Sequence, residues 1–171
     1  GRIQAIRQEV VVEDYNAPGL MLSDPVIATD VRETVQPVRF TREGTDVMAL
    51  PSKVFADGDP VYLYYEVYGL SRNLYGGSQF RIDYVVTGSR GIGRSTLVAG
   101  IASLLGVDRT SDTVTFSYEH TGTAESEPIY LSFDGLQFDK RSTVDLEIRV
   151  TDLVHPDHPT TIRTTDFAVG E

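Results

Sequence analysis

Apolar and polar side chains alternate most regularly between residues 61 and 86. Side chains of an extended chain point to opposite faces in turn, so the apolar positions of each run share one face. In the runs 61–68 and 80–86 these positions are Val61, Leu63, Tyr65, Val67, Phe80, Ile82, Tyr84 and Val86. Between the runs, Gly76-Gly77 permits the backbone angles of a turn. The pattern predicts a long β-hairpin at the centre of the hydrophobic core.

Shorter apolar runs, bounded by turn-forming residues, occupy much of the remaining chain. They cover residues 20–22, 26–31, 38–41, 46–50, 113–120, 129–133, 143–152 and 160–169. Residues 42–45 predict the turn of a short hairpin, and residues 51–60 predict a loop. One segment has a different period. Its apolar residues recur at helical spacing and predict a helix over 95–105, with Ser95 at its start and Gly106 at its end.

About nine short strands with one helix predict a mainly β protein, an antiparallel β-sandwich of the immunoglobulin or fibronectin kind with one short helix. We expect the sandwich to occupy residues 19–171. Residues 1–18 are expected to form an N-terminal strand arm and a linker. The arm either pairs within the chain or adds a strand to a sheet edge of another molecule. Its candidate interaction residues are Ile3, Ile6, Val10 and Val12.

The composition narrows the range of partners. The formal net charge is -10, which opposes binding to nucleic acid because affinity for the phosphate backbone comes largely from Lys and Arg. The absence of Cys excludes disulfides and thiolate metal sites. No run approaches the roughly 20 apolar residues of a membrane span. Because the sequence opens at Gly1 without a leader segment, we expect a processed form or a fragment.

Residues 88–95 are the sharpest chemical motif. They follow a predicted strand and precede the predicted helix, as a phosphate-binding loop does, but Arg94 stands where that loop needs Lys. A flexible connector is the simpler interpretation. The segment His155-Pro-Asp-His158 offers metal-ligand types, yet its prolines indicate the tip of a hairpin.

The acidic pairs and the possible nucleophiles do not indicate a metal site or a catalytic site. Asp57 with Asp59, and Asp108 with Asp112, could bind calcium but lack the spacing of a calcium loop. Three His, no Cys and no Ser in a nucleophile elbow give no recognisable catalytic arrangement. We therefore predict no enzyme activity, no catalytic residue, no metal and no cofactor.

The tyrosine-rich side of the run 61–68 is the second candidate interaction surface. It carries Tyr62, Tyr64 and Tyr68, with Tyr75 in the following loop. Tyrosine is favoured at interfaces because it buries a large area and keeps a polar tip. Alternatively, the predicted helix or a second sheet covers this face, and the tyrosines belong to the core.

Several segments together resemble the C-terminal β-sandwich region of bacterial GWxTD-domain proteins. They are Leu20-Met-Leu-Ser-Asp24, the run 60–70, the apolar helix, Tyr118-Glu119 and the run 148–152. The resemblance extends from about residue 20 to the end, although the naming motif is absent and the chain has no Trp. It implies a non-catalytic sandwich that is extracytoplasmic, in the periplasm or at the cell surface, and it assigns no active-site residue.

We predict a structural or accessory subunit that docks on a larger bacterial envelope or membrane-protein assembly, for example a photosynthetic or respiratory complex. Sandwich surfaces and the N-terminal arm would contact protein partners, and contact with a membrane complex would be peripheral. Two alternatives stay open. One is a free module that binds glycan or peptide through the aromatic face, and the other is a nucleotide-binding enzyme that uses residues 88–95.

Overall fold

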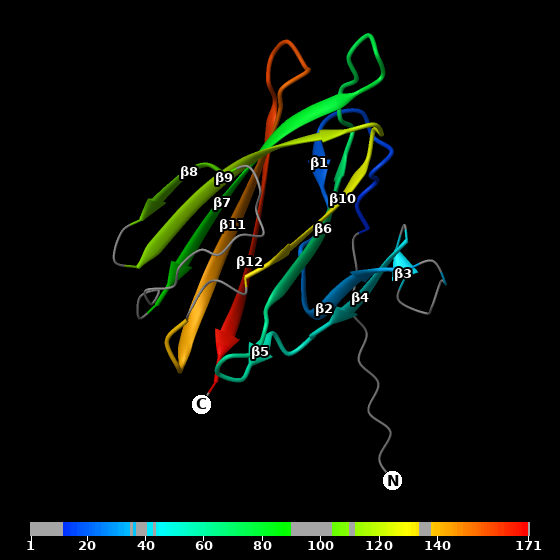
Figure 1. Ribbon diagram of the computed structural model, residues 1–171. Helices are drawn as coiled ribbons and strands as arrows, with labels where there is room; N and C mark the ends of the chain where they lie inside the picture. Colours follow the sequence, from blue (N-terminus) through cyan, green and yellow to red (C-terminus); the bar gives the residue numbers. More distant parts are fainter. Residues whose placement is uncertain are drawn as a thin grey trace.

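Two six-stranded sheets face each other and enclose the hydrophobic core (Figure 1). The computed structural model describes residues 12–34, 36, 41–42, 44–89, 104–109, 112–133 and 138–170. The β6 sheet contains β1 (Met21–Leu22), β2 (Val26–Glu33), β3 (Thr41–Arg42), β4 (Thr45–Ala49), β6 (Tyr62–Tyr68) and β10 (Glu127–Ser132). The β7 sheet contains β5 (Val54–Phe55), β7 (Ser78–Gly88), β8 (Leu104–Arg109), β9 (Thr113–Gly122), β11 (Ser142–Asp152) and β12 (Thr160–Val169). The predicted β-sandwich is confirmed.

In the β6 sheet, β1 and β2 lie end to end along one edge of β6. Met21 pairs with Tyr68 at one end of β6, and Val26 pairs with Tyr64 further along. The residues between them, Ser23-Asp-Pro25, interrupt the strand because proline has no backbone N–H for the ladder. β10 pairs with the opposite edge of β6, so β6 is the central strand of this sheet.

The β7 sheet has the order β5-β12-β11-β7-β9-β8. Every pair is antiparallel except the short parallel pair of β5 with β12. β7 runs between β11 and β9 for its whole length, which makes it the central strand. Its inward side chains are Phe80, Ile82, Tyr84 and Val86, and all four are fully buried.

The predicted hairpin of residues 61–86 is wrong, although the predicted core faces are right. β6 and β7 belong to different sheets, and residues 69–77 cross from one sheet to the other. The inward residues of the two runs are all buried and meet across the sandwich. Alternation along a strand identifies the buried face, but the same pattern fits either a neighbour in the sheet or a strand of the facing sheet.

Three tyrosines form a hydrogen-bonded group inside the core. The hydroxyls of Tyr65 and Tyr84 lie 2.7 Å apart, and Tyr84 also bonds to Tyr118. Tyrosine hydroxyls in a core need partners, and here they supply one another. Burial raises the pKa of Tyr65 and Tyr84 well above the usual value and that of Tyr118 to about 12.

The predicted helix differs from what the structure describes. Residues 95–103 lie outside the described residues, but Leu104 and Leu105 belong to β8, so a helix that reaches residue 105 is wrong. Pairing with β9 places them in a strand, with a bulge between Leu104 and Gly106. The described ranges contain no helix, and none in them is long and apolar enough to cross a membrane.

Two shorter elements refine the predicted strand pattern. The residues 51–60, predicted as a loop, contain the two-residue strand β5, whose Phe55 packs in the core against Phe167 of β12. The short hairpin of β3 and β4 is confirmed, with Thr41 paired to Asp46. Residues 38–40 of its predicted first strand lie outside the described residues.

Candidate docking surface

The β6–β7 loop, residues 69–77, is a built structure rather than a slack connection. Asn73 organises it, because its side-chain Oδ1 accepts hydrogen bonds from the N–H groups of Tyr75 at 2.9 Å and Gly77 at 3.0 Å. The backbone of Asn73 also bonds to that of Gly76 and Gly77. Asparagine side chains commonly stabilise turns in this way. Gly76 adopts a φ of 82°, which glycine tolerates without strain.

Arg72 fastens this loop to the neighbouring β9–β10 turn, residues 123–126. Its Nε donates to the carbonyl of Gly76 at 2.9 Å, and a terminal nitrogen donates to the carbonyl of Thr123 at 3.2 Å. The guanidinium also lies 3.8 Å from the Glu125 carboxylate. The backbone N–H of Leu70 donates to the carbonyl of Glu125 at 3.1 Å. The cationic group of the loop is thus used to hold the loop in place.

The tip of the β6–β7 loop presents two large apolar side chains to solvent. Leu74 is 101% exposed and Tyr75 is 97% exposed. Single exposed apolar residues are common on protein surfaces, but here two adjacent ones stand on a loop whose backbone is fixed. We call this pair the loop tip.

The β11–β12 loop, residues 153–159, projects from the same end of the sandwich as the β6–β7 loop (Figure 1). We call this end of the sandwich the loop end. Asp152, which is 1% exposed, joins the two loops. One carboxylate oxygen accepts a bond from Ser71 N–H at 2.8 Å, and the other accepts bonds from Val154 at 2.8 Å and His155 at 3.1 Å. Burial opposes ionisation of Asp152, but the hydrogen bonds from Ser71, His155 and Val154 outweigh it and lower its pKa.

The predicted tyrosine face lies on the outer side of the β6 sheet and is largely covered. Tyr64 is 0% exposed and packs with Ala28, Val31 and Val47 in a second hydrophobic cluster. Tyr62 is half-buried against the same cluster. Tyr64 therefore offers no free surface to a partner, and the structure supports the core alternative for this residue.

The chain's own N-terminal segment occupies another part of that face. The ring of Tyr15 stacks on that of Tyr68 at a centroid distance of 4.7 Å. The hydroxyls of Tyr64 and Tyr68 both donate to Glu66, which fixes the Tyr68 ring under Tyr15. Glu13 pairs with Arg163 of β12 at 2.5 Å. Segment 12–19 is thereby attached to both sheets.

Of the four predicted interaction residues of the N-terminal arm, the structure describes one. Val12 is exposed, whereas Ile3, Ile6 and Val10 lie outside the described residues. The interaction role assigned to these four side chains stays a prediction. Of the four tyrosines predicted as interaction residues, Tyr75 is the one that lies in the β6–β7 loop.

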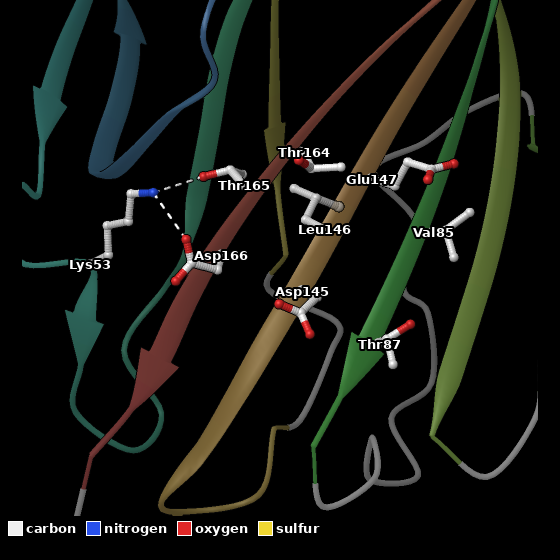
Figure 2. A pocket seen from close by; sticks show the side chains of 9 residues that line it. All are labelled: Lys53, Val85, Thr87, Asp145, Leu146, Glu147, Thr164, Thr165 and Asp166. Atoms are coloured by element: carbon white, nitrogen blue, oxygen red, sulfur yellow. Dashed lines mark hydrogen bonds and ion pairs between the residues drawn. The ribbon is translucent and has the colours of Figure 1, made fainter.

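An open groove of about 540 Å³ lies on the outer side of the β7 sheet (Figure 2). Lys53 lies at the edge of the groove, and its Nζ donates hydrogen bonds to Thr165 at 3.0 Å and Asp166 at 3.2 Å. Asp145 stands directly opposite Asp166 in the strand register. Figure 2 shows the side chains spread along neighbouring strands rather than converging on one point. Polar and apolar surface contribute about equally to the groove, and the lysine at its edge is already paired.

The remaining sequence motifs have structural roles where they are described. His155 accepts a hydrogen bond from the Asp157 N–H, and His158 bonds to the carbonyl of Asp152 at the end of β11. His120 packs against Phe80. Asp57 pairs with Lys140, and Asp59 accepts a turn hydrogen bond from Ala56. Residues 90–95 of the phosphate-loop motif lie outside the described residues. Across the described part of the chain, no three His, Asp or Glu side chains are grouped to hold a metal ion.

Comparison with known proteins adds no relative. No protein family matches the chain, and no curated protein is significantly similar to it. The resemblance to GWxTD-domain proteins stays a prediction, and functional inference depends on the surfaces of this structure.

Sequence reasoning missed two residues of the loop end. Leu74 lies between Asn73 and Tyr75 in a segment rich in turn-forming residues, and an apolar pair in such a segment was the available signal. Asp152 had no distinguishing signal, because it is one of 25 acidic residues. Only the folded structure shows that it joins two loops.

Proposed function

We propose that this protein is a non-catalytic accessory subunit that docks on a larger assembly through the loop end of its sandwich. The observation that carries the proposal is the loop tip, formed by the exposed side chains of Leu74 and Tyr75 on a hydrogen-bonded loop. Exposing two apolar side chains has no benefit for folding. Burying each of them in an interface contributes about 1.5–3 kcal/mol.

The rigidity of the loop favours binding. Ordering a flexible segment costs free energy upon association, and a segment that is already ordered avoids much of that cost. Asn73 and Arg72 hold the β6–β7 loop before any partner is present. Tyrosine is also a residue type enriched among those that dominate binding energy.

The arrangement of polar groups supports a non-catalytic role. Catalysis by general acid and base needs side chains within hydrogen-bonding reach of one reacting centre. The described histidines instead bond to nearby backbone groups or pack against Phe80. The groove of Figure 2 holds polar groups that are spread along strands.

The class of assembly follows from the sequence. The resemblance to GWxTD-domain proteins favours an extracytoplasmic bacterial setting, and the net charge of -10 disfavours nucleic acid. We propose an envelope or membrane-protein complex, for example a photosynthetic or respiratory one, with this subunit bound peripherally.

The native mass of the untagged protein tests this function. After gentle detergent release from its source cells, we expect the chain to migrate with a large complex in fixed stoichiometry. Migration at the 18.9 kDa of the single chain, with no co-migrating polypeptide, would refute the proposal.

A further inference from the structure

We infer that the docking site has two parts and that its partner is a protein with an apolar pocket and a basic rim. The pocket receives the loop tip, Leu74 and Tyr75, and the rim faces the β11–β12 loop. Asp152 fixes the position of this loop relative to the β6–β7 loop. This inference rests on the proposed function and specifies the partner of that same surface.

The charges around the loop tip favour a protein pocket over a lipid bilayer. Binding to anionic lipid depends on Lys and Arg near the surface, but Arg72 is engaged with Gly76, Thr123 and Glu125. The side chains of Glu125 in the β9–β10 turn and Asp157 in the β11–β12 loop are exposed. Entry of the tip into a bilayer would press these carboxylates against the membrane, whereas a protein pocket leaves them at its rim.

The area of the tip requires a second contact. A stable protein interface buries roughly 800 Å² on each partner, and two side chains supply less than that. A second loop that projects from the same end of the sandwich is the β11–β12 loop (Figure 1). Its exposed Asp157 carries a negative charge, and Glu125 adds a second one that Arg72, at 3.8 Å, compensates in part. Complementary charge on the partner is therefore basic.

Asp152 makes the two loops one surface. Its two carboxylate oxygens accept hydrogen bonds from the backbone of both loops, from Ser71 on one side and from Val154 and His155 on the other. The backbone of Leu153 also bonds to Gln79 of β7 at 2.9 Å. We assign Asp152 as a positioning residue, because it is buried and acts on a partner only through the loops that it connects.

Site-specific photocrosslinking in the source cells tests this geometry. A benzophenone amino acid is placed at position 75, at position 156 in the second loop, or at position 162, which is exposed on the outer side of β12. We expect positions 75 and 156 to crosslink to one and the same polypeptide, with apolar residues at the position 75 adduct, and position 162 to give none. Adducts to different polypeptides, or equal yields at all three positions, would overturn the two-part site.

Paired substitutions separate this inference from the proposed function. Leu74→Ser with Tyr75→Ser should weaken docking on the isolated complex by at least 100-fold, by the arithmetic of lost apolar burial. The matched control is Met48→Ser with Ile162→Ser, two exposed apolar residues elsewhere on the surface. If the wild-type chain co-migrates with a complex and the loop-tip variant docks equally well, the function stands and the inference fails.

Binding to lipid and the positioning role of Asp152 are each tested by a separate measurement. Vesicles of phosphatidylcholine, with or without phosphatidylserine, should not co-sediment the chain, and co-sedimentation that the loop-tip variant loses would overturn the protein pocket. Asp152→Asn should lower the crosslink yield at position 156 relative to that at position 75. Gly58→Ala, a variant of a distant turn, should leave this ratio unchanged. Equal losses at both positions in Asp152→Asn would reduce Asp152 to a general stabilising role.

Discussion

Replacing Gly69 by alanine should destabilise the protein far more than an ordinary turn substitution. Gly69 has a φ of 68°, a left-handed conformation that costs an L-residue about 1–2 kcal/mol. A Cβ atom there would lie 2.0 Å from the carbonyl oxygen of Gly19, where real contacts are essentially never below 3.0 Å. The two backbones must therefore move apart by about 1 Å, the difference between those two distances.

That movement loosens the N-terminal attachment as well. Gly19 directly follows the segment whose Tyr15 stacks on Tyr68 and whose Glu13 pairs with Arg163. Stacking is worth about 0.5–1.5 kcal/mol and a partly exposed ion pair about 0.2–1 kcal/mol. Together with the backbone conformation, we expect Gly69→Ala to lower the free energy of unfolding by about 2–4 kcal/mol.

Urea denaturation measures this loss, and Gly58→Ala is the matched control. Gly58 has a φ of 83° and no atom within 4 Å of the added Cβ, so only the conformational cost of about 1–2 kcal/mol applies. Hydrogen exchange should also become faster in residues 15–22 of Gly69→Ala and remain unchanged there in Gly58→Ala. Equal destabilisation of the two variants would refute the clash argument.

Three further outcomes are expected. The pKa of Tyr118 is raised to about 12 and those of Tyr65 and Tyr84 are also raised, so the stability that these groups contribute is full below about pH 10 and is lost as the pH rises through their folded-state pKa values. Thermal melts at increasing alkaline pH detect the loss, and a flat profile would contradict it. The lowered pKa of Asp152 gives stability that is present above about pH 4 and lost below it. Asp152→Ala should remove that acid dependence and cost about 3 kcal/mol in urea, since buried N–H groups lose their acceptor. Tyr15→Ala should cost about 1 kcal/mol without weakening docking, and a docking defect would assign partner contact to the N-terminal segment.

Strand positions and buried faces could be predicted from the sequence because both depend on local alternation. The predicted run 160–169 coincides with β12 (Thr160–Val169), and the large apolar residues on the inward faces of β6 and β7 were identified. Strand pairing could not be predicted. The nine residues 69–77 are long enough to span the roughly 10 Å between packed sheets, and nothing in the alternation distinguishes such a crossing from a hairpin.

The tyrosine face shows a second limit of local pattern. Tyr64 points away from the main core, as alternation predicts, yet it is fully buried because Ala28, Val31 and Val47 pack around it. Those residues come from β2 and β4, far away in the sequence. The same applies to the predicted helix, where the spacing of Leu104 and Leu105 suits a helix but pairing with β9 places both in a strand.

The repeated passage of the chain between the sheets has a kinetic consequence. The β6 sheet contains β1 to β4, β6 and β10, so the chain changes sheet five times, after β4, β5, β6, β9 and β10. Neither sheet can be completed before most of the other has formed. Paired strands such as β10 and β6, or β11 and β7, are far apart in the sequence. The entropy of bringing them together is lost before the contacts that compensate for it are made. The domain should therefore fold slowly, on the order of milliseconds to seconds.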